Sequence, residues 1–234
     1  MRALFIQQDH VSPPGPVGDA LAERGYEIVE FNVVPEERFD DPHLSVDFPD
    51  PREFDLIVPM GAVWAVYDAD KIHWIRQELD LLRTAHEAGV SILGLCFGGQ
   101  ALAAALGGSV RPAGGEEVGW VVVDTDDAEL VAPGPWFEWH SDLFEPPPGA
   151  RVVARTDLCP QAFVIGRSMG VQFHPELTPG QLESWLDHGG RAYLDSHEVD
   201  ADDLLSETRG TAAAAALRTR ALVHRFLDQV ACLD

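Results

Sequence analysis

Short apolar runs alternate with longer helical patterns through the N-terminal part of the chain, and this rhythm constrains the fold more than any other feature. The expected strands are residues 3–6, 27–33, 56–60 and 90–95. Between them, residues 17–23 and 71–87 place apolar side chains at helical spacing. Strands and helices in this order predict an α/β fold with a mostly parallel central sheet covered by helices on both faces. A ligand crevice in such a sheet lies at the carboxyl ends of the strands.

After Gly107 the pattern changes to short strand-like runs separated by proline and glycine turns. The runs are residues 120–123, 151–154, 162–165 and 170–173. They predict an antiparallel extension of the sheet. Residues 41–54 are rich in proline and aspartate, which indicates a surface loop. The tail beyond Pro179 is helical in pattern, so we expect one domain over residues 1–234 with a helical C-terminal extension from about residue 191.

The chain is strongly acidic, with 39 acidic and 16 basic residues and a formal net charge of −23. Such a surface repels a phosphate backbone, so we expect no nucleic-acid partner. Lys71 is the single lysine, and an acidic surface that is nearly free of lysine resembles those of proteins from a high-salt cytoplasm. We therefore hypothesise that the protein is adapted to salt.

The cysteine content and the hydropathy pattern favour a cytoplasmic protein. Cys96, Cys159 and Cys232 form no CxxC pair and are too few for a disulfide scaffold. The N-terminal apolar run is too short for a signal peptide, and no stretch approaches the roughly 18 apolar residues of a membrane span. The hydropathy pattern therefore predicts no membrane partner. The acidic runs at 124–129 and 198–203 lack metal-ligand spacing, so we expect no metal.

One segment places a reactive side chain at a strand end. Residues 92–100 read ILGLCFGGQ, an apolar strand that leads through Cys96 into glycines and a helix expected over residues 101–106. A sharp strand-to-helix turn needs small neighbours and places the thiol at the helix N-terminus. There the exposed amides and the helix dipole favour the thiolate, the nucleophilic form, and the amide of Phe97 can bind an oxyanion. A buried structural cysteine before a glycine-rich turn is the alternative interpretation.

The general base is expected to be a histidine, and His174 stands out among the nine in the chain. It ends an expected strand in the run VQFHPE. Residues two apart on an extended chain point the same way, and Pro175 favours an extended conformation, so His174 and Glu176 should lie side by side. A carboxylate beside an imidazole fixes its tautomer and stabilises the imidazolium. A histidine and a glutamate that merely face solvent are the alternative.

Together, the motifs GLCFGGQ and QFHPE resemble those of the class I glutamine amidotransferases, which release ammonia from glutamine. The resemblance spans roughly residues 56–182 and implies a flavodoxin-like class I amidotransferase architecture. It implies that Cys96 attacks the side-chain amide to form a γ-glutamyl thioester, that His174 shuttles the protons and that Glu176 completes the triad. The type is similar to the glutaminase part of GMP synthase, standing alone.

The resemblance also assigns residues around the triad. Gly61 in VPMGAVW takes the place of the family glycine that forms the oxyanion hole together with the amide of Phe97, although the family run is GGP and this chain has PMGA. Gln100 matches the family glutamine that follows the nucleophile and lines the substrate site. The run WHSD resembles the family's WHGD loop, which places His140 and Ser141 beside the substrate.

The leading hypothesis is a glutamine amidotransferase that hydrolyses glutamine to glutamate and ammonia for a separate synthase. The chain has no glycine-rich phosphate loop and no SGGxDS-like pyrophosphatase signature, so the ATP-using half would be a partner protein, and the hydrolysis itself needs no cofactor. A γ-glutamyl peptide or γ-glutamyl amine hydrolase acting alone would use the same residues. A non-catalytic regulatory subunit that retains the fold is the third hypothesis.

Overall fold

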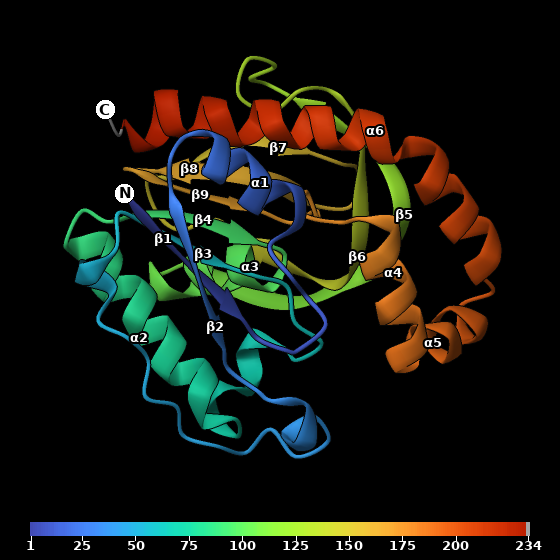
Figure 1. The fold of residues 1–234 in the computed structure, drawn as a ribbon, viewed down its shortest axis with the longest axis horizontal. Coiled ribbons are helices and arrows are strands. Elements are labelled where there is room, and N and C mark those ends of the chain that lie inside the picture. The colour runs from blue at the N-terminus through green and yellow to red at the C-terminus, as the bar shows by residue number, and fades with distance from the viewer. Residues whose placement is uncertain (233–234) are drawn as a thin grey trace.

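The computed structural model describes residues 1–232, and its centre is a nine-stranded sheet (Figure 1). The parallel strands are β1 (Arg2–Gln7), β2 (Glu27–Asn32), β3 (Leu56–Pro59), β4 (Ser91–Leu95) and β9 (Ser168–Val171). The antiparallel strands are β5 (Ser109–Thr125), β6 (Gly134–Glu145), β7 (Arg151–Arg155) and β8 (Pro160–Ile165). They lie in the order β2-β1-β3-β4-β9-β8-β7-β5-β6. The predicted fold class, a mostly parallel sheet with an antiparallel extension, is confirmed.

Helices cover both faces of this sheet. One face carries α1 (Gly15–Glu23), α6 (Ala201–Arg225) and η5 (Phe226–Ala231), and the other carries α2 (His73–Glu87) and α3 (Phe97–Ala105) (Figure 1). Successive side chains of a strand point to opposite faces. In β4, Leu93 and Leu95 accordingly pack in the cluster with α1 and α6, whereas Ile92 packs in the cluster with α2 and α3.

The segments that follow β9 close the carboxyl edge of the sheet. They are α4 (Pro179–Trp185), the kinked turn η4 (Leu186–Gly190) and α5 (Arg191–Ser196). These segments pack with the start of α6 on Phe137 of β6 in a third apolar cluster. The end of α6 and η5 bury Leu222 and Phe226 in the main core, so this tail is part of the central packing. One domain over residues 1–234 stays a prediction, and residues 233–234 lie outside the described part of the chain.

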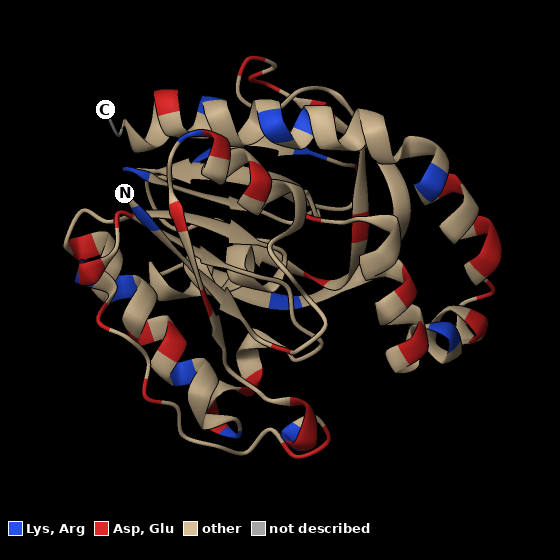
Figure 2. Ribbon diagram, viewed as in Figure 1, with Lys and Arg blue, Asp and Glu red and all other residues tan. Residues whose placement is uncertain are grey.

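Three short 3-10 turns lie in the connections: η1 (Glu36–Arg38), η2 (Pro51–Glu53) and η3 (Val66–Asp70). The segment 41–54 is a connection as predicted, interrupted only by η2. No helix within residues 1–232 is both long and apolar enough to cross a membrane. Acidic positions outnumber basic ones along the ribbon as a whole (Figure 2).

Several predicted boundaries were wrong. The strand expected over residues 120–123 is the end of the 17-residue β5, and β6 was not predicted at all. These two strands pair mostly with each other, and Val122 is 66% exposed, so their side chains lack the apolar alternation of a half-buried strand. The helix expected over residues 101–106 begins at Phe97, directly after the nucleophile candidate.

Candidate active site

Cys96 forms the turn between β4 and α3 and caps the helix N-terminus. Its φ of 49° and ψ of −108° are values that cost a residue other than glycine about 1–3 kcal/mol. Gly98 and Gly99 are required because the backbones of neighbouring strands approach them closely. A Cβ at Gly98 would lie 2.0 Å from the Pro59 carbonyl oxygen, and one at Gly99 would lie 2.4 Å from the Val171 carbonyl oxygen. The turn therefore fixes the thiol at the carboxyl ends of three parallel strands.

His174 lies three residues beyond β9 and is 6% exposed. Its backbone N–H donates to the Phe137 carbonyl oxygen at 2.8 Å, which ties this segment to β6. Its Nδ1 lies 2.8 Å from Oε1 of the fully buried Glu176. Because a carboxylate only accepts hydrogen bonds, Nδ1 carries a proton, which leaves Nε2 as the nitrogen that can take up and release one. The ring of Trp185 packs edge-on against the imidazole at a centroid distance of 5.0 Å and holds its plane.

Cys96 and His174 face each other beside Gly61. A Cβ at Gly61 would lie 2.8 Å from Cε1 of His174 and 3.8 Å from the Cβ of Cys96, so a larger residue would displace the imidazole. Burial disfavours the charged ring, but the Cys96 thiolate and the Glu176 carboxylate outweigh burial and raise the pKa of His174 well above its usual value. The arrangement therefore favours the imidazolium form of His174 beside the Cys96 sulfur.

The candidate residues surround a cavity of about 500 Å³. Seven of the eight line it, namely Gly61, Cys96, Phe97, Gln100, His140, Ser141 and His174. The eighth, Glu176, contacts the imidazole of His174 but does not line the cavity. A cavity of this size accommodates a small molecule such as an amino acid. The structure thus brings the predicted residues together, and their individual catalytic and binding roles stay predictions.

Gln100 connects the nucleophile turn to the cavity wall. It lies one helical turn beyond Cys96 and is buried, with Nε2 donating to Oε1 of Gln172 at 3.2 Å and to the Asp142 carbonyl oxygen at 3.3 Å. Gln172 in turn donates to the Cys96 Sγ at 3.6 Å. Sequence analysis assigned no role to Gln172, although its place two residues before His174 puts it on the same side of an extended chain.

His140 and Ser141 lie within β6, so the loop expected around them was wrong. The cause is the long hairpin with β5, which extends regular pairing through this run. His140 is buried, with Nε2 3.0 Å from Oε2 of Glu117 and Nδ1 2.9 Å from the Asp142 carbonyl oxygen, whereas Ser141 is exposed. Burial alone would raise the pKa of Glu117, but hydrogen bonds led by that from His140 lower it below its usual value.

Glu138 is a second buried carboxyl group that sequence analysis missed. It is fully buried, and neither carboxyl oxygen has a hydrogen-bond partner among the described residues, although Oε2 lies 3.4 Å from Nε2 of His140. Burial, reinforced by the charge of Glu117, raises the pKa of Glu138 well above its usual value. The neutral, protonated form of this carboxyl group is therefore favoured more strongly than it would be in water. An acidic residue in a strand ordinarily indicates a solvent-facing position, and only the fold reveals this one.

Comparisons with known proteins identify the family of the chain. The family model described as glutamine amidotransferase class-I matches residues 19–189. A GMP synthase [glutamine-hydrolyzing] of Thermus thermophilus is 36% identical over 135 residues, a segment covering 52% of this chain but only 27% of that relative. The chain therefore corresponds to about a quarter of the length of this curated relative.

Solved structures share the fold along nearly the whole chain. A glutamine amidotransferase from Thermotoga maritima has a TM-score of 0.84 at 24% identity, covering 98% of this chain and 99% of that one. A glutamine amidotransferase from Methylobacillus flagellatus has a TM-score of 0.80 at 25% identity, with coverages of 98% and 95%. The flavodoxin-like architecture expected from the sequence is confirmed. The chain belongs to the class I glutamine amidotransferase family.

Proposed function

We propose that this protein hydrolyses the side-chain amide of glutamine through a thioester on Cys96. The observation that carries the proposal is the arrangement of Cys96 at a strained helix N-terminus, facing a buried imidazole whose far nitrogen is held by Glu176. A nucleophile, a base and a group that orients the base are the parts that covalent amide hydrolysis requires. Membership of the family supports the same chemistry.

In the first half of the reaction, the Cys96 thiolate attacks the amide carbon, and the carbonyl electrons move onto oxygen. The backbone amide of Phe97, at the N-terminus of α3, and the backbone at Gly61 are placed beside the thiol and would hold the oxyanion. The imidazolium of His174 then donates its Nε2 proton to the amide nitrogen. The C–N bond breaks, ammonia leaves, and a γ-glutamyl thioester remains on Cys96.

In the second half, a water molecule attacks the thioester carbon while Nε2 of His174 accepts a proton from it. The C–S bond breaks and glutamate is released with the thiolate restored. Glu176 keeps Nδ1 protonated throughout, so that Nε2 is always the nitrogen that faces the reaction. Gln100, His140 and Ser141 would contact the substrate, since all three line the same cavity.

We further propose that the ammonia passes to a separate synthase. The Thermus thermophilus relative is named a glutamine-hydrolyzing GMP synthase, and the matched segment is only 27% of it. The alignment does not extend to the remainder of that relative. The synthase would supply the acceptor chemistry.

The proposal is tested by measuring glutamate release from glutamine and from a γ-glutamyl alkylamide, with the wild type and the Cys96→Ala and Cys159→Ala variants. The proposal expects release from glutamine that Cys96→Ala abolishes and Cys159→Ala leaves unchanged. Faster release from the alkylamide than from glutamine would favour a γ-glutamyl amine hydrolase instead. Release that survives in Cys96→Ala would remove that residue as the nucleophile.

A further inference from the structure

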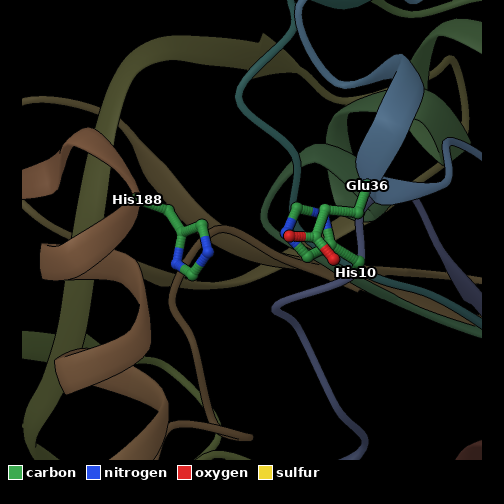
Figure 3. Close-up of side chains that lie close together, drawn as sticks. All are labelled: His10, Glu36 and His188. Carbon is green, nitrogen blue, oxygen red and sulfur yellow. The ribbon is translucent and has the colours of Figure 1, made fainter.

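His10, Glu36 and His188 come from three distant parts of the chain and lie close together (Figure 3). His10 follows β1, Glu36 opens η1, and His188 lies in the kinked turn η4. Each residue offers one ligand atom, and the three atoms lie within 4.8 Å of one another. Figure 3 shows His188 extending from its helical segment toward the other two side chains. His188 also lines the cavity that contains Cys96.

The hydrogen bonding of His10 is unusual for a histidine in this position. Both of its ring nitrogens are inaccessible to solvent, and neither has a hydrogen-bond partner among residues 1–232. Leaving a buried polar group unpaired costs about 1–3 kcal/mol. The ring makes edge-on contacts with Phe39 and His188, at centroid distances of 5.6 and 5.2 Å. A lone pair on this ring is therefore fixed in direction and lacks a partner.

His188 has its tautomer set by the backbone. Its Nδ1 lies 2.7 Å from the Ser184 carbonyl oxygen, and because a carbonyl can only accept, Nδ1 carries the proton. Nε2 is then left with a free lone pair. Histidines that bind metals normally donate their second ring N–H to a carbonyl or carboxylate in this manner. Glu36 is exposed and pairs with no basic side chain within the described residues, so its carboxylate is also free to bind.

From these observations we propose that His10, Glu36 and His188 bind one divalent transition-metal ion of the zinc class. Two imidazoles and a carboxylate suit zinc and its neighbours, whereas magnesium and calcium prefer sites made of oxygen. Tetrahedral bonds to zinc hold ligand atoms about 3.4 Å apart. The three ligand atoms lie within 4.8 Å of one another. Side-chain rotations that move each atom by about 1 Å bring them to the tetrahedral separation. Three protein ligands leave a fourth position for water.

The ion would join three segments: the turn after β1, η1, and the turn between α4 and α5. Two of these segments border the cavity, through Val11 and His188. The ion therefore acts as a clamp that holds the rim of the cavity in one arrangement. This inference does not depend on the proposed hydrolysis.

A second group, Glu117, His140 and Cys159, has a comparable spacing but different chemistry. Both ring nitrogens of His140 already have partners, in Glu117 and the Asp142 carbonyl oxygen. Burial raises the pKa of the Cys159 thiol to about 12, which disfavours the thiolate that a metal requires. Glu117 and His140 are therefore already hydrogen bonded, whereas the ring nitrogens of His10 are not. For this reason the group of His10, Glu36 and His188 is the metal candidate.

The test measures metal binding directly, in a Cys96→Ala background so that the reactive thiol cannot capture the ion. Chelator-treated protein is titrated with zinc chloride, cobalt chloride and magnesium chloride, followed by calorimetry, by the visible absorption of cobalt and by melting temperature. The proposal expects one zinc or cobalt ion per chain, a melting temperature that rises with zinc, and no response to magnesium. Failure to bind one equivalent of either transition metal would overturn it.

Variants of the ligands locate the site. Glu36→Gln and His188→Gln should each bind zinc more than about 100-fold more weakly, because even second-sphere changes cost 10- to 100-fold. Glu37→Gln, the next residue on η1, and His73→Gln, an exposed histidine on α2, are the matched controls and should bind as the parent does. Zinc binding that survives unchanged in both ligand variants lies elsewhere and refutes the assignment.

Discussion

Glu78 lies in the middle of α2, fully buried against the sheet. One carboxyl oxygen, Oε1, accepts a hydrogen bond of 2.7 Å from Nε2 of Gln8, and the other has no partner among the described residues. Burial outweighs this hydrogen bond and raises the pKa of Glu78 from an ordinary 4.5 to about 8. The folded protein therefore holds a proton on this group at neutral pH, whereas the unfolded chain releases it.

The consequence is a pH-dependent loss of stability. Below the unfolded pKa both states carry the proton and Glu78 contributes no pH dependence. As pH rises through the window from 4.5 to about 8, the unfolded chain ionises and the folded one does not, so the free energy of unfolding falls. Each pH unit within the window costs about 1.4 kcal/mol, or about 3 kcal/mol between about pH 5 and about pH 7.5.

Glu78→Gln keeps the shape and the acceptor for Gln8 but removes the titration. The free energy of unfolding is measured by urea denaturation, followed by tryptophan fluorescence. The difference between the variant and the wild type should increase with pH in favour of the variant. The gain over the wild type should grow by about 3 kcal/mol between about pH 5 and about pH 7.5. Glu87→Gln, at the exposed end of the same helix, should give a curve parallel to the wild type. Parallel curves for Glu78→Gln would refute the reasoning.

Three further predictions concern the site and the surface. Gly61→Ala places a methyl group against Cε1 of His174 and should lower kcat/KM for glutamine by about 100-fold; an unchanged value would show that the ring moves aside freely. His174→Ala removes the proton acceptor and should lower the rate of glutamate release by at least about 1,000-fold, and an unchanged rate excludes it from the triad. Thermal melts in dilute and molar KCl should give a higher melting temperature in the salt, because screening relieves repulsion among the acidic side chains; equal values would contradict adaptation to salt (Figure 2).

The nucleophile turn could be predicted from the sequence because its determinants are local. Cys96 and the glycines at 98 and 99 are contiguous, and the strand before them is apolar throughout. Two-residue spacing likewise sufficed to pair His174 with Glu176. The parallel half of the sheet followed from apolar runs with helices between them, since burial on both faces leaves a continuous apolar signal.

The rest of the site depends on contacts that no local pattern encodes. The β5–β6 hairpin pairs largely with itself, so its strands lack a clear alternation and His140 was placed in a loop. Glu138 lies in the same hairpin and is fully buried, which no local pattern indicates. His10 and His188 are separated by most of the chain, so their meeting follows from the fold alone.

The role of Cys96 is tested most directly by an electrophilic glutamine analogue, with the modified peptide identified by mass spectrometry. The account predicts a single glutamine-protected adduct, on Cys96, which is absent from Cys96→Ala. The exposed Cys232 serves as an internal measure of labelling that glutamine does not prevent. A glutamine-protected adduct on Cys159, or one that persists in Cys96→Ala, would contradict the account.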